Sequence, residues 1–137
     1  MTQLTDTEFE QQFASCTLNP DLLTHEEHIR LAWIHLRKYG LTAAVENLCT
    51  QIAKYDKVHG DGTKYHQTLT VAAVYVVDHF VRLSHAETFE EFKAEFPELL
   101  THFRELISRH YSEIRLNDSR AKHQYLEPDI ESFDPGQ

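Results

Sequence analysis

The 137-residue chain is poor in the residues that break or cross-link a backbone, with four glycines, four prolines and two cysteines. So few glycines and prolines disfavour a β architecture, which needs many tight turns. The two cysteines, Cys16 and Cys49, belong to no C-x-x-C pair, so they indicate neither a redox motif nor a disulfide framework. We interpret each as a small buried hydrophobe, a usage that suits a reducing compartment.

Long apolar runs are also missing. No apolar segment follows Met1, so the sequence gives no indication of a secretory signal. No stretch reaches the roughly 18 apolar residues that cross a bilayer. The longest candidate, residues 71–77, fits a core segment. We therefore expect a cytoplasmic protein with no membrane partner.

Positive charge is the third shortage, because 13 lysines and arginines stand against 22 acidic residues and the formal net charge is −9. An acidic chain repels phosphate backbones, which argues against a nucleic acid as partner. The same repulsion weakens binding to anionic lipid surfaces. The expected partner is instead a small-molecule substrate or ligand, and a homodimer is compatible with the sequence.

The chain does have enough apolar residues for one core. Apolar residues make up 41% and charged residues 26%, and the length fits one domain. Apolar positions recur at helical spacing, so the sequence predicts an all-α, single-domain bundle of about five to six helices over 1–137. Residues 117–137 are expected to form a polar tail that packs over the body. The predicted helices cover residues 6–16, 25–39, 43–58, 64–83, 89–96 and 97–110.

Capping residues mark several of these helix ends. A T-x-x-E pattern, typical of a capping box, begins two helices, at Thr24 and at Thr88. Gly40 fits the position just after the second helix, where a left-handed conformation costs glycine little. Thr42 is then predicted to cap the third helix. So short a turn makes the second and third helices an antiparallel hairpin.

The helix predicted over 64–83 differs from the others because apolar residues cover almost its whole circumference. A helix of that kind is buried among other helices, so we predict that it is the central helix of the bundle. Its first residues are polar, with Tyr65, His66, Thr68 and Thr70 in succession. Buried polar groups at this point need partners.

Three of the ten histidines lie where helices begin. His25 and His28 share one face, which continues into Ile29 and Ala32 and so points toward the core. His66 lies at the start of the central helix. The positive end of the helix dipole favours neutral imidazole, the form that ligates metals or acts as a base. An up-down topology brings the two helix starts to one end of the bundle.

These three histidines form the predicted site. Three imidazoles with an open position make a common catalytic zinc arrangement, which also serves iron, copper or nickel. The sequence therefore predicts a mononuclear transition-metal enzyme of hydrolytic or oxidative type, with His25, His28 and His66 as ligands. Tyr65 and Thr70 are the catalytic candidates. Candidate additional ligands are His59, Asp61, Glu127 and Asp129.

Two alternatives stay open. In the first, a metal-free pocket binds a small molecule, and the histidines, Tyr65, Thr68 and Thr70 are hydrogen-bond partners or acid–base groups. In the second, the chain is a helical interaction or regulatory module whose histidines are buried and hydrogen-bonded. Better-known signatures are absent from the sequence, including H-E-x-x-H, E-x-x-H, G-x-S-x-G and the P-loop.

Three segments together resemble a family of uncharacterised small helical bacterial proteins of about this length. They are T-H-x-x-H at 24–28, Y-H-x-T-x-T at 65–70 and E-P-D at 127–129. The resemblance covers about residues 13–129. It implies that the three segments form one site, which would bring the tail motif to the histidines. It implies no reaction and no cofactor.

Overall fold

The computed structural model describes residues 4–133, and all regular secondary structure in that part of the chain is helical. The predicted all-α single domain is therefore confirmed. Eight α-helices are present where five to six were expected, because the region after residue 97 divides into short pieces. The helices are α1 (Asp6–Ala14), α2 (His25–Tyr39), α3 (Leu41–His59), α4 (Gln67–Leu83), α5 (Phe89–Glu95), α6 (Glu98–Thr101), α7 (Phe103–Ser108) and α8 (Glu113–Leu116), with a 3₁₀ turn η1 (Pro20–Leu22) between α1 and α2.

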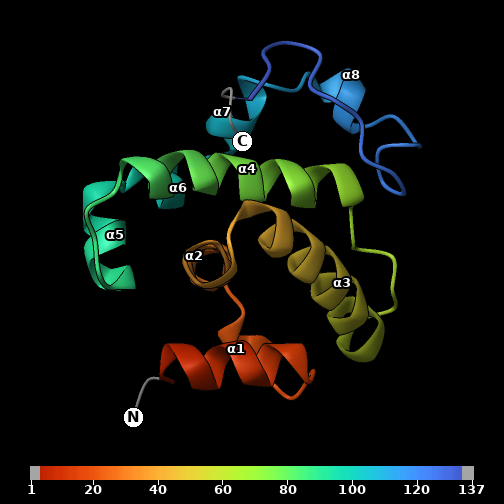
Figure 1. The fold of residues 1–137 in the computed structure, drawn as a ribbon. Helices are drawn as coiled ribbons and strands as arrows, with labels where there is room; N and C mark the ends of the chain where they lie inside the picture. The colour runs from red at the N-terminus through yellow and green to blue at the C-terminus, as the bar shows by residue number, and fades with distance from the viewer. Residues whose placement is uncertain (1–3, 134–137) are drawn as a thin grey trace.

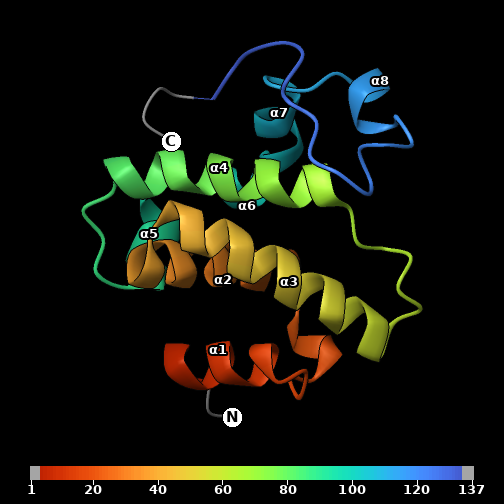
Figure 2. The ribbon, with the colours of Figure 1, turned by 45° about the vertical axis from the view of Figure 1, so that its right-hand side comes forward.

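The three longest helices form the centre of the molecule. α2, α3 and α4 pack against one another, and α4 lies across the other two (Figure 1). α1 covers the face of α2 and α3 that points away from α4, whereas α7, α8 and the chain from there to residue 133 lie beyond α4 (Figure 2). α4 is thus flanked on both sides, and its Ala72 and Val77 have no solvent exposure. The predicted central position of this helix follows from its all-round apolar surface.

Capping accounts for most of the helix ends. The Thr24 side chain accepts a hydrogen bond from the Glu27 amide, and Thr88 and Glu91 form a reciprocal capping box. Gly40 has a φ of +85°, the region that favours glycine, and its amide donates to Leu36 to close α2.

Two predicted helix starts need correction. α3 begins at Leu41, directly after Gly40, so Thr42 lies inside the helix and does not cap it. α4 begins at Gln67 and not at residue 64, because the His66 side chain is its N-cap and accepts a hydrogen bond from the Leu69 amide. The Asp56 carboxylate of α3 accepts hydrogen bonds from the amides of Lys64 and Tyr65, which holds this segment outside the helix.

Two predicted helix ends also differ. α1 ends at Ala14, two residues before Cys16, which has a φ of +62° that no α-helix accommodates. The single helix expected over 97–110 is broken at His102, which has a φ of −134° and separates α6 from α7. α8 was not predicted, and the Ser112 side chain caps it.

The chain after α8 packs against the start of α4. The amides of Gln67 and Thr68 donate to the carbonyls of Lys122 and Ala121. The Thr68 hydroxyl, which is fully buried, donates to the Gln124 carbonyl and accepts from the amide of Leu126. These bonds satisfy amides that the first turn of a helix otherwise leaves unpaired.

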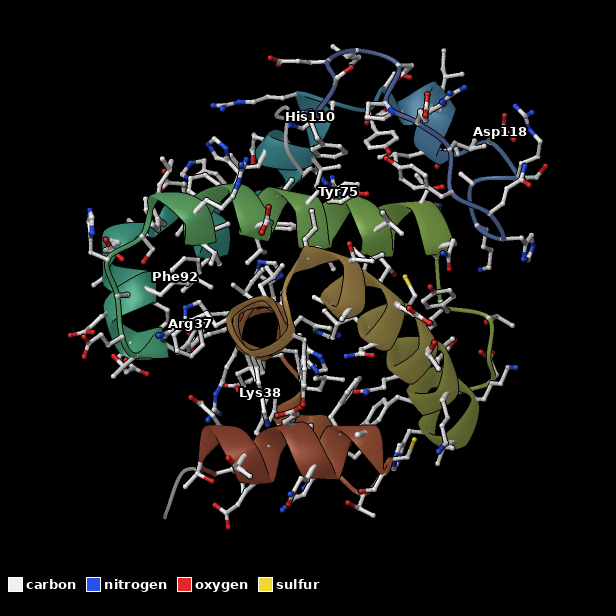
Figure 3. The ribbon with its side chains drawn as sticks, in the orientation of Figure 1. Arg37, Lys38, Tyr75, Phe92, His110 and Asp118 are labelled. Carbon is white, nitrogen blue, oxygen red and sulfur yellow. The ribbon has the colours of Figure 1, made fainter. Side chains whose placement is uncertain are left out.

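Aromatic contacts continue the same packing along α4. Tyr75 of α4 contacts the rings of Tyr125 and Phe133, with ring centres 6.4 and 5.0 Å apart (Figure 3). The Tyr111 hydroxyl donates to the Leu126 carbonyl. The described part of the tail, up to residue 133, is therefore held on α4 by backbone hydrogen bonds and by ring packing. In residues 4–133, no helix combines the length and the apolar character needed to cross a membrane.

Candidate functional site

A cavity of about 970 Å³ lies beside the start of α4. Its walls come from the first turns of α2, the middle of α3, the first half of α4, and the region from α6 to α8. Most of the wall is apolar, and its polar residues include three histidines. The apolar wall includes Ile29, Ala32, Leu48, Ile52, Leu69, Ala73, Val74, Val77, Leu100, Phe103, Ile107 and Leu116.

The polar part of the wall contains five of the residues predicted from the sequence. His25, His28, His66, Tyr65 and Thr70 all line this one cavity. We call these five residues the histidine wall. His25 and His28 begin α2, whereas Tyr65, His66 and Thr70 lie at the start of α4 or just before it, so the cavity lies where these two helix starts meet. α4 crosses α2 and α3 (Figure 1), so this meeting does not come from the up-down path that the sequence analysis expected.

His25 and His28 are each held by one ring nitrogen. His25 Nε2 donates to the carbonyl of Leu99 at 3.0 Å, and His28 Nδ1 donates to the carbonyl of Thr24 at 3.0 Å. A carbonyl oxygen can only accept, so each neutral ring carries its hydrogen on the bonded nitrogen. His25 Nδ1 and His28 Nε2 therefore keep a lone pair, and no hydrogen bond among residues 4–133 uses either atom.

The surroundings of these two rings suit an open cavity wall. Both side chains are exposed to solvent, and the rings of His25 and Phe103 pack edge to face, with 5.2 Å between their centres. Removal from bulk water by the surrounding protein lowers the pKa of His28, and the charge of a protonated His25 would lower it further. His28 is therefore neutral near pH 7 and can accept a hydrogen bond.

His66 differs because both of its ring nitrogens are used inside the protein. Nδ1 accepts from the Leu69 amide at 3.0 Å, and Nε2 donates to the carbonyl of Leu116 at 3.1 Å. This side chain is a helix cap and a link to the end of α8. To ligate a metal it would have to give up one of these two bonds.

Tyr65 and Thr70, the two catalytic candidates, also donate their hydroxyl hydrogens within the protein. The Tyr65 hydroxyl donates to Gln67 Oε1, and the Thr70 hydroxyl donates to the His66 carbonyl. Burial, together with the neighbouring Cys49 thiol, raises the pKa of Tyr65, so the phenol stays protonated. Burial also raises the pKa of Cys49, so it is a neutral thiol beside the cavity and not a reactive thiolate.

Charged side chains complete the lining. Lys64 and Arg104 contribute positive charge, and Glu105 and Glu113 contribute negative charge. All four are exposed to solvent. These four residues were not predicted as part of the site, because they come from separate parts of the chain and their positions match no sequence motif. The two signs balance, so the cavity as a whole has no marked preference for an anion or a cation.

The four candidate additional ligands do not line the cavity. His59 Nε2 is within 2.7 Å of the carbonyl of Cys16, near the turn after α1. Asp61 accepts from the amide and hydroxyl of Thr63, and this lowers its pKa. The Asp129 carboxylate accepts from the amide and hydroxyl of Ser112. Glu127 is exposed, and its carbonyl accepts from Arg115.

Thr68 does not line the cavity either, although it was an expected hydrogen-bond partner there, since its hydroxyl holds the tail. Within residues 4–133, no group of three or more His, Cys, Asp or Glu side chains is arranged so that it could hold a metal ion. Among the histidines of the cavity lining, the ring nitrogens without a hydrogen bond are His25 Nδ1 and His28 Nε2.

Comparison of the chain with protein-family models, with curated proteins and with solved structures found no significant match. The resemblance to small helical bacterial proteins therefore stays a prediction.

Proposed function

We propose that the chain binds a small organic molecule in the cavity beside α4. The observation that carries this proposal is a cavity of about 970 Å³ with mostly apolar walls and a few convergent polar groups. Pockets for small molecules in proteins have roughly 300–1,000 Å³ and the same mixture of surfaces. Of the alternatives that the sequence leaves open, the metal-free binding pocket fits these features best.

The histidine wall supports the proposal through its unused lone pairs. His25 Nδ1 and His28 Nε2 come from rings whose orientation is fixed by a bond to a backbone carbonyl. A fixed ring loses little freedom when a ligand arrives, so the bond that it makes to the ligand is stronger. Either nitrogen could also act as a general base on a bound molecule, which would make the chain an enzyme.

A cavity-filling variant tests binding. Ala73 lies on α4 in the cavity wall, so A73F places a ring in the space that the ligand would occupy. Ala94, exposed on α5 and outside the cavity, provides the matched control A94F. We expect naphthalene- and indole-type fragments to bind the wild type and A94F in ligand-observed NMR, and not to bind A73F. Equal binding by a folded A73F would overturn the proposal.

A metal site at His25 and His28 is the second candidate, favoured by one observation. Histidines that ligate metals usually donate their other ring N–H to a carbonyl or carboxylate, and both of these histidines do so. A bound transition metal with an open position would supply Lewis-acid chemistry. His66 fits the ligand set less well, because both of its ring nitrogens are already used.

Zinc titration of untagged protein separates the two candidates. If the site is a metal centre, calorimetry gives one equivalent of binding, which is lost in H28A and kept in H123A, where an exposed histidine outside the cavity is removed. If the cavity is metal-free, neither variant changes the weak background heat. Elemental analysis of the protein as purified gives an independent reading.

A further inference from the structure

We infer that the ligand of this cavity is a largely apolar, uncharged molecule that carries a hydrogen-bond donor, such as a phenol or an aromatic N–H group, facing His25 and His28. This inference rests on the proposed binding function and specifies its ligand class. It follows from which polar hydrogens of the cavity wall are already used inside the protein and which lone pairs are not.

The donors of the histidine wall are all used within the protein. The ring N–H groups of His25, His28 and His66 donate to the carbonyls of Leu99, Thr24 and Leu116. The hydroxyls of Tyr65 and Thr70 donate to Gln67 Oε1 and to the His66 carbonyl. A ligand that approaches this wall therefore meets acceptors and no unused side-chain donor.

The hydrogens of the other hydroxyl groups in the cavity lining are also used within the protein. The Thr101 hydroxyl lies within hydrogen-bond distance of the Pro97 carbonyl and of His102 Nδ1, so its hydrogen is used by one of them. Ser108 donates to the carbonyl of Arg104, and Tyr111 to the carbonyl of Leu126. The remaining donors in the lining are the exposed side chains of Lys64, Arg104 and Asn117.

Two ring nitrogens of the histidine wall can still accept a hydrogen bond. His25 Nδ1 and His28 Nε2 belong to one face of the first turns of α2, three residues apart. An O–H or N–H group of a ligand can donate to either of them. A carbonyl, ether or carboxylate oxygen would face lone pairs without a hydrogen between them, and its own loss of water would not be compensated.

Charge at the lining does not favour an ionic ligand. A carboxylate would be attracted by Lys64 and Arg104 and repelled by Glu105 and Glu113, and a cation would experience the reverse. All four charges are exposed, so water and salt weaken their effect. Apolar walls over most of the cavity add the requirement that the rest of the molecule be apolar.

Three naphthalenes of nearly equal size test the inference on the wild-type protein. 2-Naphthol carries a donor, 2-methoxynaphthalene has the same oxygen without the hydrogen, and 2-naphthoate is an anion. We expect 2-naphthol to bind about tenfold more tightly than the methoxy compound at pH 7.5, the effect of one good hydrogen bond. 2-Naphthoate should bind at least as weakly as the methoxy compound. Calorimetry or the intrinsic fluorescence of the probes gives the affinities.

Variants locate the acceptor. H28F removes one lone pair and keeps a ring on an exposed position, and we expect it to reduce the preference for 2-naphthol about threefold or more. The matched control H123F changes an exposed histidine outside the cavity and should leave the preference intact. Circular dichroism shows whether each variant is folded, and the series on the wild type does not depend on either variant.

The outcomes test the donor requirement separately from the proposed binding function of the cavity. Equal or tighter binding of 2-methoxynaphthalene or 2-naphthoate overturns the donor requirement, while the cavity remains a binding site. An unchanged preference in folded H28F overturns the role of His28 as the acceptor. If none of the three naphthalenes binds, the inference fails, and the fragment comparison of A73F with A94F decides separately whether the cavity binds anything.

Discussion

Two histidines on the same stripe of α2 have opposite surroundings. His28 and His35 are seven residues apart, two helical turns, and therefore point to nearly the same side. His28 is exposed, lines the cavity and has one ring nitrogen bonded to a carbonyl. His35 has no solvent exposure, and neither of its ring nitrogens has a hydrogen-bond partner. One end of the stripe thus faces the cavity and the other is closed off from solvent.

α1 closes the second end. Glu10 of α1 accepts hydrogen bonds from Lys38, at 2.9 Å, and from the Tyr39 hydroxyl, both at the end of α2 (Figure 3). Glu10 itself is only 8% exposed. The ring of Tyr39 also contacts the ring of His35, with 5.3 Å between their centres. The same residue type thus lines a cavity where the neighbouring elements leave space, and is a core residue where they do not.

Truncating a leucine to alanine is expected to give the largest difference in stability loss between the buried core and the cavity wall. Leu31 is 1% exposed and lies outside the cavity lining, whereas Leu69 is 41% exposed and lines the cavity. L31A should lower the free energy of unfolding by about 2–5 kcal/mol, because it leaves a void in packed surroundings. L69A should lower it by less than about 1 kcal/mol, because water already reaches that side chain. Urea denaturation measures both.

Similar losses in the two variants would contradict the comparison. Such a result would mean that the side chains around Leu69 are packed as closely in solution as those around Leu31. L69A has a further use, because it widens the cavity. An altered affinity for 2-naphthol in this variant, with stability nearly unchanged, would place the ligand against the α4 wall.

A second, smaller effect separates two threonines on α4. Thr68 is fully buried and holds the carbonyl of Gln124 and the amide of Leu126, whereas Thr70 donates only to the His66 carbonyl, four residues earlier. T68V keeps the shape and leaves both tail groups unpaired, which should cost about 1–3 kcal/mol. T70V should cost less than about 1 kcal/mol, because valine is tolerated in a helix and the His66 carbonyl already accepts the Thr70 amide.

Hydrogen exchange adds a local measurement to the same pair. In T68V the amides of Gln67, Thr68 and Leu126 should exchange faster, since all three belong to the contact between tail and helix. In T70V they should keep the protection of the wild type. A T68V variant with unchanged protection at these amides would show that the tail is held mainly by its aromatic contacts with Tyr75.

More of the fold than of the candidate site could be predicted from the sequence. All-round apolar composition placed the 64–83 helix at the centre, and the T-x-x-E patterns located the starts of two helices, because these signals are local. The prediction that the three histidines meet in one place relied only on the order of the helices. Two of the bonds that define their chemistry join residues far apart in the sequence: Leu99 is 74 residues from His25, and Leu116 is 50 residues from His66. Their carbonyls are backbone groups that no residue pattern identifies.

Two further predictions differ from the structure. His66 follows the pattern of a helical residue, but its ring caps α4, an alternative that the sequence does not distinguish from a ligand. Glu127 and Asp129 were candidate additional ligands of the histidine site, and the family resemblance also implied that their segment lies there. The Asp129 carboxylate instead accepts hydrogen bonds from Ser112 at the start of α8. The cavity itself depends on side chains from α2 to α8, and its volume could not be derived from any one segment.

The last prediction concerns the closed end of the stripe. Burial lowers the pKa of His35; the nearby Glu10 carboxylate opposes this shift, and Lys38 adds to it. A histidine whose pKa is lower in the folded state than in the unfolded state, where it is about 6.5, contributes fully to stability above pH 6.5. That contribution is lost as the pH falls toward the pKa of the folded state. The wild type should therefore lose stability between pH 7.5 and pH 5.5, by up to about 1.4 kcal/mol per pH unit for this group.

H35L removes the buried ring without leaving a partner unpaired, since neither ring nitrogen has one. We expect its unfolding free energy to fall less than that of the wild type between pH 7.5 and pH 5.5, by about 1 kcal/mol. Part of the acid sensitivity should persist, because His28 also has a lowered pKa. The matched control H123L removes an exposed histidine and should follow the wild type. If H35L retains the full acid sensitivity, the ring of His35 is reached by water in solution, and the two ends of the stripe are less different than their burial indicates.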